Sequence, residues 1–155
     1  MKVDALMTRE VEPCTPFTSL AAAVEVMWRR DCGVVPVVDA EQRVIGVITD
    51  RDIAIALGTR DGAACAIGVG DVMTRPARTC RVDDELPTAI AVMKAGRVRR
   101  LPVIDARGRL AGILSVHDLA RAAGSPALSH ADLAGLLQSI GQSRPTTTGP
   151  LVVSA

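Results

Sequence analysis

A repeat of 66 residues is the feature that most limits what this chain can fold into. The tripeptide MTR at residue 7 recurs at residue 73, and the segment GVITDRD, which begins at Gly46, recurs in outline as GILSVHD from Gly112. No gap is needed to keep this register. Self-similarity of this kind is typical of a chain built from two copies of one structural unit. We therefore expect one repeat at residues 3–57 and a second at residues 69–123.

Each copy predicts the same series of elements. In the first copy, Thr18 or Ser19 can cap a helix that ends near Gly33, with apolar residues at helical spacing: Leu20, Ala23, Val24 and Met27. Two β-branched runs follow, VVPVVD and VIGVIT, separated by the polar turn AEQR, and they favour a pair of strands. DRDIAIAL then predicts a helix. The second copy predicts a helix from Asp83 or Asp84 to about Lys94, strands at RLPVID and RLAGILS, and a helix at VHDLARAAG.

A repeat of this size buries too little surface to be stable alone, so the two copies are expected to pack together. The predicted fold class is α/β (α+β), with a small sheet and flanking helices in each repeat, packed sheet to sheet with pseudo-twofold symmetry. Residues 58–68 are Gly-rich and predict a linker. Residues 124–142 predict a C-terminal amphipathic helix capped by Ser129, with an apolar stripe at Leu133, Leu136, Leu137 and Ile140. Residues 143–155 predict a flexible tail.

Composition argues against nucleic acid and membranes as partners. The formal net charge is +1, and Phe17 and Trp28 are the only aromatic residues. Such a chain lacks both the basic surface and the stacking platforms that nucleic-acid binding uses. No apolar run is long enough to span a membrane, and the N-terminus does not read as a signal peptide, so we expect a cytoplasmic location. The four cysteines show no zinc-ligand spacing and are expected to be reduced and packed: Cys14, Cys32, Cys65 and Cys80.

The repeated motif offers groups that could bind a phosphorylated nucleoside. Thr49 stands where a strand turns into a helix, the backbone N–H groups of the first helical turn could bind an anion, and Asp52 could accept the hydroxyls of a ribose. Arg51 could contact phosphate. The second copy offers the same arrangement in Ser115, His117 and Asp118. The alternative is that these hydroxyls and carboxylates only cap helices, and a duplication would copy caps as well.

Arginines before the strand of the second copy form another candidate. Arg99 and Arg100 end the run RVRR and directly precede LPVID. By default such a run is a solvated surface near the end of a helix, where cations are favourable. Because the strand that follows lies beside the proposed pocket, these two guanidinium groups could also reach a phosphate.

These motifs together resemble the CBS domain, and two in tandem resemble a CBS pair, or Bateman module, of the small stand-alone bacterial type that includes the hypoxic response protein. The resemblance rests on LMTR, VVPVVD and GVITDRD in the first copy and on VMTR, RLPVID and GILSVHD in the second. It implies a regulatory module that binds AMP, ADP, ATP or S-adenosylmethionine in the cleft between the repeats. Asp52 and Asp118 would then bind ribose, and Thr49 and Ser115 ribose or phosphate.

The resemblance also implies which backbone would flank the adenine. These residues are Val34, Val35, Pro36, Leu101 and Pro102, at the start of strands. Thr15 or Arg81, from the segment before the first helix of each copy, would lie near the base.

Three functions are compatible with the fold that these motifs predict. The first is an adenosyl-ligand sensor, expected to form a homodimer and to act on a protein target. The second is a dimeric interaction or redox-responsive protein with vestigial nucleotide clefts, in which Cys14 and Cys80 respond to oxidation. The third is an enzyme, which is disfavoured because the sequence offers no nucleophile-base pair, metal-ligand cluster or P-loop. No cofactor and no metal site are expected.

Overall fold

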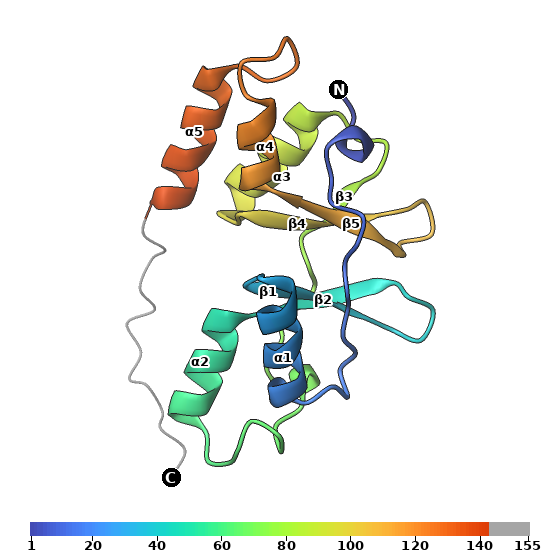
Figure 1. Ribbon diagram of the computed structural model, residues 1–155, viewed down its shortest axis with the longest axis vertical. Helices are drawn as coiled ribbons and strands as arrows, with labels where there is room; N and C mark the ends of the chain where they lie inside the picture. The colour runs from blue at the N-terminus through green and yellow to red at the C-terminus, as the bar shows by residue number, and fades with distance from the viewer. Residues whose placement is uncertain (143–155) are drawn as a thin grey trace. The chain divides into compact units, whose positions relative to one another are not determined.

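The computed structural model describes residues 1–142, and these residues form two compact units (Figure 1). One, called here the N-repeat unit, comprises Glu12–Ala77. The other, called here the C-repeat unit, comprises Met1–Val11 together with residues 78–142. Residues 143–155, for which a flexible tail is predicted, lie outside the described residues.

The N-repeat unit combines two α-helices with a two-stranded antiparallel sheet. Its elements are α1 (Leu20–Arg30), β1 (Val34–Val38), β2 (Val44–Thr49), α2 (Asp50–Thr59) and a short 3-10 helix, η2 (Val69–Asp71). Figure 1 shows α1 and α2 on the same side of the hairpin. The segment before α1 adds a parallel bridge to the hairpin, between Cys14 and Val37.

The C-repeat unit has the same helix-strand-strand-helix order and adds the strand β3 and a further helix, α5. Its elements are η1 (Val3–Ala5), β3 (Cys80–Arg81), α3 (Leu86–Gly96), β4 (Arg100–Ile104), β5 (Leu110–Ser115), α4 (Val116–Ala122) and α5 (His130–Gly141). The sheet order is β3-β4-β5, with β3 parallel and β5 antiparallel to β4. The expected mixture of small sheets and flanking helices is therefore found in both units.

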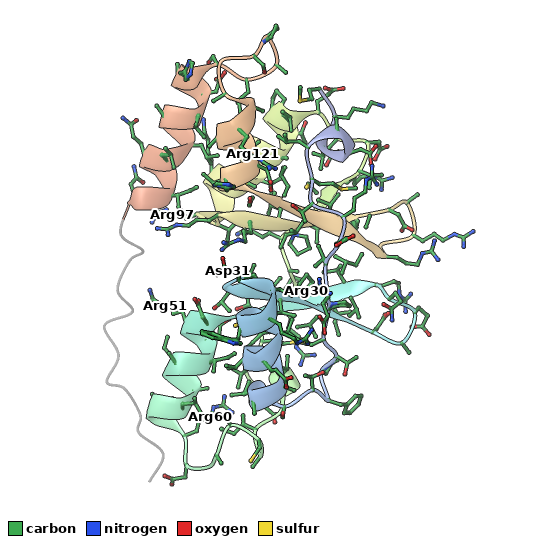
Figure 2. The ribbon with its side chains drawn as sticks, in the orientation of Figure 1. Arg30, Asp31, Arg51, Arg60, Arg97 and Arg121 are labelled. Atoms are coloured by element: carbon green, nitrogen blue, oxygen red, sulfur yellow. The ribbon has the colours of Figure 1, made fainter. Side chains whose placement is uncertain are left out.

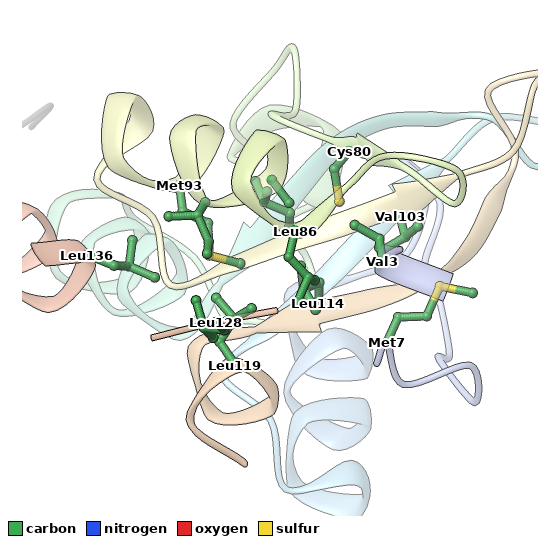
Figure 3. Close-up of a cluster of buried hydrophobic side chains, with 13 residues drawn as sticks. Val3, Met7, Cys80, Leu86, Met93, Val103, Leu114, Leu119, Leu128 and Leu136 are labelled. Carbon is green, nitrogen blue, oxygen red and sulfur yellow. The ribbon is translucent and has the colours of Figure 1, made fainter. Parts of the chain in front are cut away.

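Each unit has its own apolar core. In the N-repeat unit the buried residues include Leu20, Ala23, Val35 and Ile48. The C-repeat core is built from aliphatic side chains and extends to α5 (Figure 3); it includes Val3, Leu86, Met93, Leu101, Leu114, Leu119 and Leu136, all 0% exposed. Burial of a large aliphatic side chain contributes about 1.5–3 kcal/mol. These side chains therefore hold the strands in place on which the motif residues stand.

The first segment of each repeat packs into the core that the other repeat builds. Val3 and Met7 belong to the C-repeat core, while Val69 and Met73 belong to the N-repeat core. In the C-repeat unit, Thr8 pairs with Ile113 through two backbone hydrogen bonds of 2.9 Å. The equivalent pair in the N-repeat unit joins Thr74 to Val47. The boundaries of the compact units consequently differ from those predicted for the repeats.

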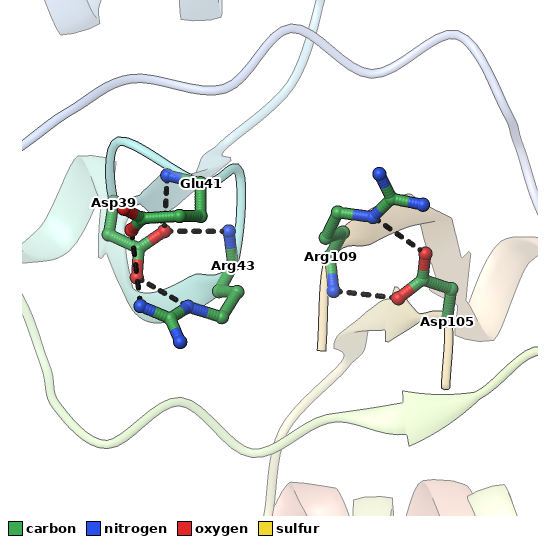
Figure 4. Close-up of polar contacts among 5 residues, drawn as sticks. All are labelled: Asp39, Glu41, Arg43, Asp105 and Arg109. Carbon is green, nitrogen blue, oxygen red and sulfur yellow. Dashed lines mark hydrogen bonds and ion pairs between the residues drawn. The ribbon is translucent and has the colours of Figure 1, made fainter. Parts of the chain in front are cut away.

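The hairpin turns of the two units are closed by the same ion pair (Figure 4). In one, Arg43 Nε lies 2.8 Å from Asp39 Oδ2, and in the other, Arg109 Nε lies 3.0 Å from Asp105 Oδ2. Asp105 Oδ1 also accepts from the backbone N–H groups of Arg107 and Arg109. The backbone hydrogen bond from Arg109 is the main reason that the pKa of Asp105 lies below its usual value. These clamps fix the register of each strand pair.

Several details of the predicted helices needed correction. Helix α3 begins at Leu86 with Glu85 as its N-cap, later than the predicted start at Asp83 or Asp84, because Pro87 suits the first turn. Val24 is 43% exposed, and Val26 takes its place in the core. Leu137 was assigned to the apolar stripe of the C-terminal helix but is 51% exposed. For Val24 and Leu137 the helical period is right, and the buried face of the helix excludes the residue.

The stretch expected to be a linker, residues 58–68, is partly structured. Gly58 and Thr59 form the end of α2, and Ala64 and Ile67 pack against the N-repeat core. The backbone carbonyl of Ile67 accepts from the N–H of Leu20 at 2.9 Å, which ties this stretch to the start of α1.

Candidate functional site

In the N-repeat unit the candidate site lies where β2 ends and α2 begins. Thr49 is the N-cap of α2, and its Oγ1 accepts from the Asp52 N–H at 3.1 Å. Asp52 Oδ2 accepts in return from the Thr49 N–H at 3.0 Å. Among residues 1–142, nothing is hydrogen-bonded to Asp52 Oδ1, and the Thr49 hydroxyl proton has no acceptor. One carboxylate oxygen and one hydroxyl donor therefore remain for another molecule.

In the C-repeat unit the equivalent groups are more fully occupied. Ser115 caps α4 in the same way, and Asp118 Oδ2 accepts from both the Ser115 N–H at 2.9 Å and the Ser115 hydroxyl at 2.6 Å. Asp118 Oδ1 accepts from Arg121 Nη2 at 2.8 Å. Asp118 is only 4% exposed. Both of its carboxylate oxygens are thus engaged by its own helix.

A third capping box, in α5, shows that this geometry alone does not identify a ligand site. Ser129 Oγ donates to Asp132 Oδ2 at 2.6 Å and accepts from the Asp132 N–H at 3.1 Å. This pair lies outside both repeats. Helix α5 follows α4 in the chain, whereas α2 and α4 each follow a strand directly. The capping role therefore accounts for the hydroxyl-carboxylate spacing in all three helices. A ligand role must therefore be argued from the donor and acceptor groups that each hydroxyl-carboxylate pair leaves without a hydrogen-bond partner.

The start of α2 is not an open anion site, contrary to the expectation from the sequence. Its first N–H, of Asp50, donates to the Gly33 carbonyl at 3.1 Å, and the second, of Arg51, donates to Asp50 Oδ1 at 2.8 Å. The third, of Asp52, donates to Thr49. All three N–H groups of the first turn therefore have acceptors, so a phosphate would depend on side chains.

The strand residues named for adenine contact fall into two groups. Val35 and Leu101 are 0% exposed and point into the cores, and Pro36 and Pro102 are also buried, so these four residues could offer a ligand little besides backbone. Val34 is half-buried and pairs with Thr49, which places it at the junction.

Thr15 lies away from the junction of its own unit. The bridge between Cys14 and Val37 puts it near the far end of β1, whereas Thr49 pairs with Val34 at the near end. Because this bridge is parallel, Thr15 lies level with Val38, four residues along β1 from Val34, which corresponds to about 13 Å. The N-repeat unit thus does not bring Thr15 together with Thr49 and Asp52.

Four basic side chains are exposed beside the two junctions: Arg51, Arg99, Arg100 and His117. Arg51 extends from the first turn of α2 (Figure 2). Arg99 is tied to the other junction, because its carbonyl accepts from the Val116 N–H at 2.9 Å. Within the described part of the chain none of these four forms an ion pair. They are available to an anion.

The fold and the repeated junction match a known protein family. The family model of the CBS domain matches this chain twice, at residues 3–59 and 69–125. The chain belongs to the CBS domain family.

Proteins of similar size are among its relatives. The chain is 36% identical over 121 residues to an uncharacterized 17.7 kDa protein of Acidianus ambivalens, covering 78% of this chain and 72% of that protein. The crystal structure of CBSX2 in complex with AMP superposes with a TM-score of 0.66 at 29% identity, over 78% of this chain and 94% of CBSX2. Hypoxic Response Protein I, solved with two coordinated zinc ions, gives a TM-score of 0.70 at 28% identity, over 78% of this chain and 98% of that protein. The CBS-pair fold inferred from the motifs is therefore confirmed.

The described residues of this CBS protein lack two further features, a membrane-spanning helix and a metal-binding cluster. No helix within residues 1–142 is both long and apolar enough to cross a membrane. The same residues contain no group of three or more His, Cys, Asp or Glu side chains placed to hold a metal ion.

The four cysteines of this CBS protein are all free thiols, and they differ in exposure. Cys14 and Cys80 are buried, as expected, whereas Cys65 is exposed. Burial raises the pKa of Cys14 to about 11 and that of Cys80 to about 12. With these raised pKa values, both buried thiols stay protonated near neutral pH. They are therefore poorly reactive, because the thiolate is the reactive form. This environment disfavours the redox-responsive alternative built on these two residues.

Sequence reasoning missed Arg121. It lies three residues after Asp118 on α4, a spacing at which side chains of opposite charge meet on a helix. The sequence therefore carried the signal, although it could not show that the carboxylate would be buried.

Proposed function

We propose that this chain is a regulatory module that binds an adenosyl ligand, such as AMP, ADP, ATP or S-adenosylmethionine, and signals through its conformation or a protein target. Membership of the CBS family supports this, as does the AMP complex of CBSX2. The observation that carries the proposal is the junction of β2 and α2, where Asp52 Oδ1 and the Thr49 hydroxyl are left without partners among residues 1–142.

The chemistry of this junction suits a nucleoside. A ribose diol can donate to Asp52 Oδ1, Thr49 can donate to a ring or phosphate oxygen, and the exposed Arg51 can form a charge-assisted hydrogen bond with phosphate. Binding would be reversible, with no cofactor and no chemical step. A ligand that prefers one conformation of the module would shift the population toward it, and this shift is the signal.

The substitution Asp52→Asn tests the ribose contact. The amide oxygen can still accept the Thr49 N–H, but the charged acceptor is lost, so AMP binding should weaken by about 1.5–3 kcal/mol. In thermal unfolding, the wild-type protein with AMP at one hundred times its dissociation constant should gain about 2.7 kcal/mol, or about 5–10 °C. The substituted protein should lose most of that gain.

Asp132→Asn is the matched control, because it makes the same change in a capping box outside the repeats. It should leave the AMP-induced shift intact while altering stability about as much as Asp52→Asn does. The proposal fails if no adenosyl compound raises the unfolding temperature, or if GTP raises it as much as AMP does. It also fails if both substitutions leave the AMP shift unchanged, since Asp52 would then be only a cap.

An exposed apolar surface on α1 supports a second part of the proposal, a homodimer. We define this surface by Val24 and Trp28, which are 43% and 86% exposed and lie one helical turn apart. Trp is strongly enriched among residues that dominate interface energies. A second copy of the chain that covers this surface would remove both side chains from water.

Replacing Trp28 with Arg should break such a dimer. Loss of a central aromatic contact costs about 2 kcal/mol or more, which raises the dimer dissociation constant about thirtyfold or more. Sedimentation velocity at micromolar concentration would then show a dimer for the wild-type protein and a monomer for the variant. Leu137→Arg, at an exposed leucine of α5, should remain dimeric. A monomeric wild-type protein would rule the dimer out.

We also propose that the chain works in the cytoplasm. Its four cysteines are free rather than paired in disulfides, which is the usual state in a reducing compartment.

A further inference from the structure

The two repeats differ in the number of hydrogen bonds that their motif aspartate accepts from the protein itself. Asp118 accepts three hydrogen bonds, from the Ser115 N–H, the Ser115 hydroxyl and Arg121 Nη2. Asp52 accepts one, from the Thr49 N–H. The side chain of Asp118 is 6% exposed, and that of Arg121 is 62% exposed. The guanidinium of Arg121 thus covers the Asp118 carboxylate. Among the described residues, Asp52 has no equivalent partner.

The residue that makes the difference can be read from the 66-residue offset. Position 55 corresponds to position 121, and it is occupied by Ile55, which is 49% exposed on α2. An isoleucine cannot donate a hydrogen bond, so Asp52 Oδ1 stays unpaired within the described residues. Both positions lie three residues after their aspartate, on the same helical face.

We propose that Arg121 withdraws Asp118 from ligand binding, so that the Asp52 motif alone takes the ribose of the adenosyl ligand. This inference rests on the proposed function and assigns its ligand site to one repeat. A ribose diol needs two acceptor positions on a carboxylate, and at Asp118 it would have to displace a charge-assisted hydrogen bond and the Ser115 hydroxyl. At Asp52 it displaces neither. Arg121 therefore acts as an internal substitute for the ligand.

Exchanging the two residues tests the inference. Ile55→Arg should place a guanidinium on Asp52 and weaken AMP binding by about tenfold or more. Arg121→Ile should release Asp118 and raise the stoichiometry, measured by isothermal titration calorimetry, from one AMP per chain to two. Ile55→Met and Arg121→Lys are the matched controls. The first changes the side chain without adding a hydrogen-bond donor, and the second keeps a cation beside Asp118, so both should behave like the wild-type protein.

The outcomes separate this inference from the proposed function. Two AMP molecules per wild-type chain, or one AMP per chain in both the wild-type protein and Arg121→Ile, would overturn the role of Arg121 while the sensor function stands. Binding only after Arg121→Ile would support the role of Arg121 and refute the function proposed for the wild-type chain. Absence of AMP binding in every variant would overturn both.

Discussion

Replacing Leu136 with alanine should lower the free energy of unfolding of the C-repeat unit by about 2–5 kcal/mol, because the change leaves a cavity in a packed core. Leu136 is 0% exposed and belongs to the same cluster as Met93 on α3 (Figure 3). Helix α5 lies outside the repeated sequence, yet it contributes to the core as the repeat helices do. Urea unfolding followed by far-ultraviolet circular dichroism would measure the loss.

The neighbouring leucine provides the control for this substitution. Leu137 is 51% exposed, so Leu137→Ala should change the free energy of unfolding by no more than about 0.5 kcal/mol. Equal and small effects of the two substitutions would contradict the packing of α5 against the C-repeat core. A large effect confined to Leu136 would show that this helix is an integral part of the unit.

The elements of each repeat could be predicted because their signals are local. The sequence predicts caps at Thr18 or Ser19 and at Ser129, and the hydroxyl oxygens of Ser19 and Ser129 cap their helices. The β-branched runs form the expected strand pairs, with five aligned residue pairs in each. The buried face of a helix was harder to predict, because tertiary contacts decide it. At the α1 surface, Val24 fits the apolar period and is nevertheless exposed.

The candidate site was predicted only in part. The sequence shows that Thr49 and Asp52 stand at a strand-to-helix junction, but it does not show how their hydrogen bonds are shared. The acceptors of the first N–H groups of α2 include the Gly33 carbonyl, which reaches the junction only after the chain has folded. The ion pair between Arg121 and Asp118 likewise involves a carboxylate that becomes buried only when the unit folds. Which groups remain for a ligand is therefore a property of the folded unit.

The exchange of first segments could not be inferred from the repeat at all. A duplicated sequence suggests that each copy packs its own first segment, whereas Met7 lies in the core of the C-repeat unit. The backbone hydrogen bonds next to Met7 join residues more than a hundred positions apart, Thr8 and Ile113. Short-range patterns contain no information about such pairings. The pairing of Thr8 with Ile113 nevertheless requires a close approach of two backbone segments, and Gly112 leaves room for it.

Gly112→Val should destabilise the C-repeat unit by about 3 kcal/mol, the upper end of the usual cost of overpacking. A Cβ atom at Gly112 would lie 2.6 Å from the Thr8 carbonyl oxygen and 2.9 Å from the Met7 sulfur. The first of these atoms is backbone, which cannot move without breaking the two hydrogen bonds between Thr8 and Ile113. Differential scanning calorimetry would record the loss. Gly46, with a backbone oxygen of Thr74 at 2.7 Å from its Cβ position, should respond in the same way.

Gly58→Val makes the same substitution where the structure leaves room. Nothing lies within 4 Å of a Cβ atom at Gly58, near the end of α2, and valine is a slightly better helix former than glycine. The free energy of unfolding should therefore change by less than about 0.5 kcal/mol. If Gly112→Val proved as mild as Gly58→Val, the first segment of the chain could not be held against β5 by Thr8 and Ile113. A large loss at Gly112 alone would show that this exchanged segment is part of the fold, because only its presence makes the glycine necessary.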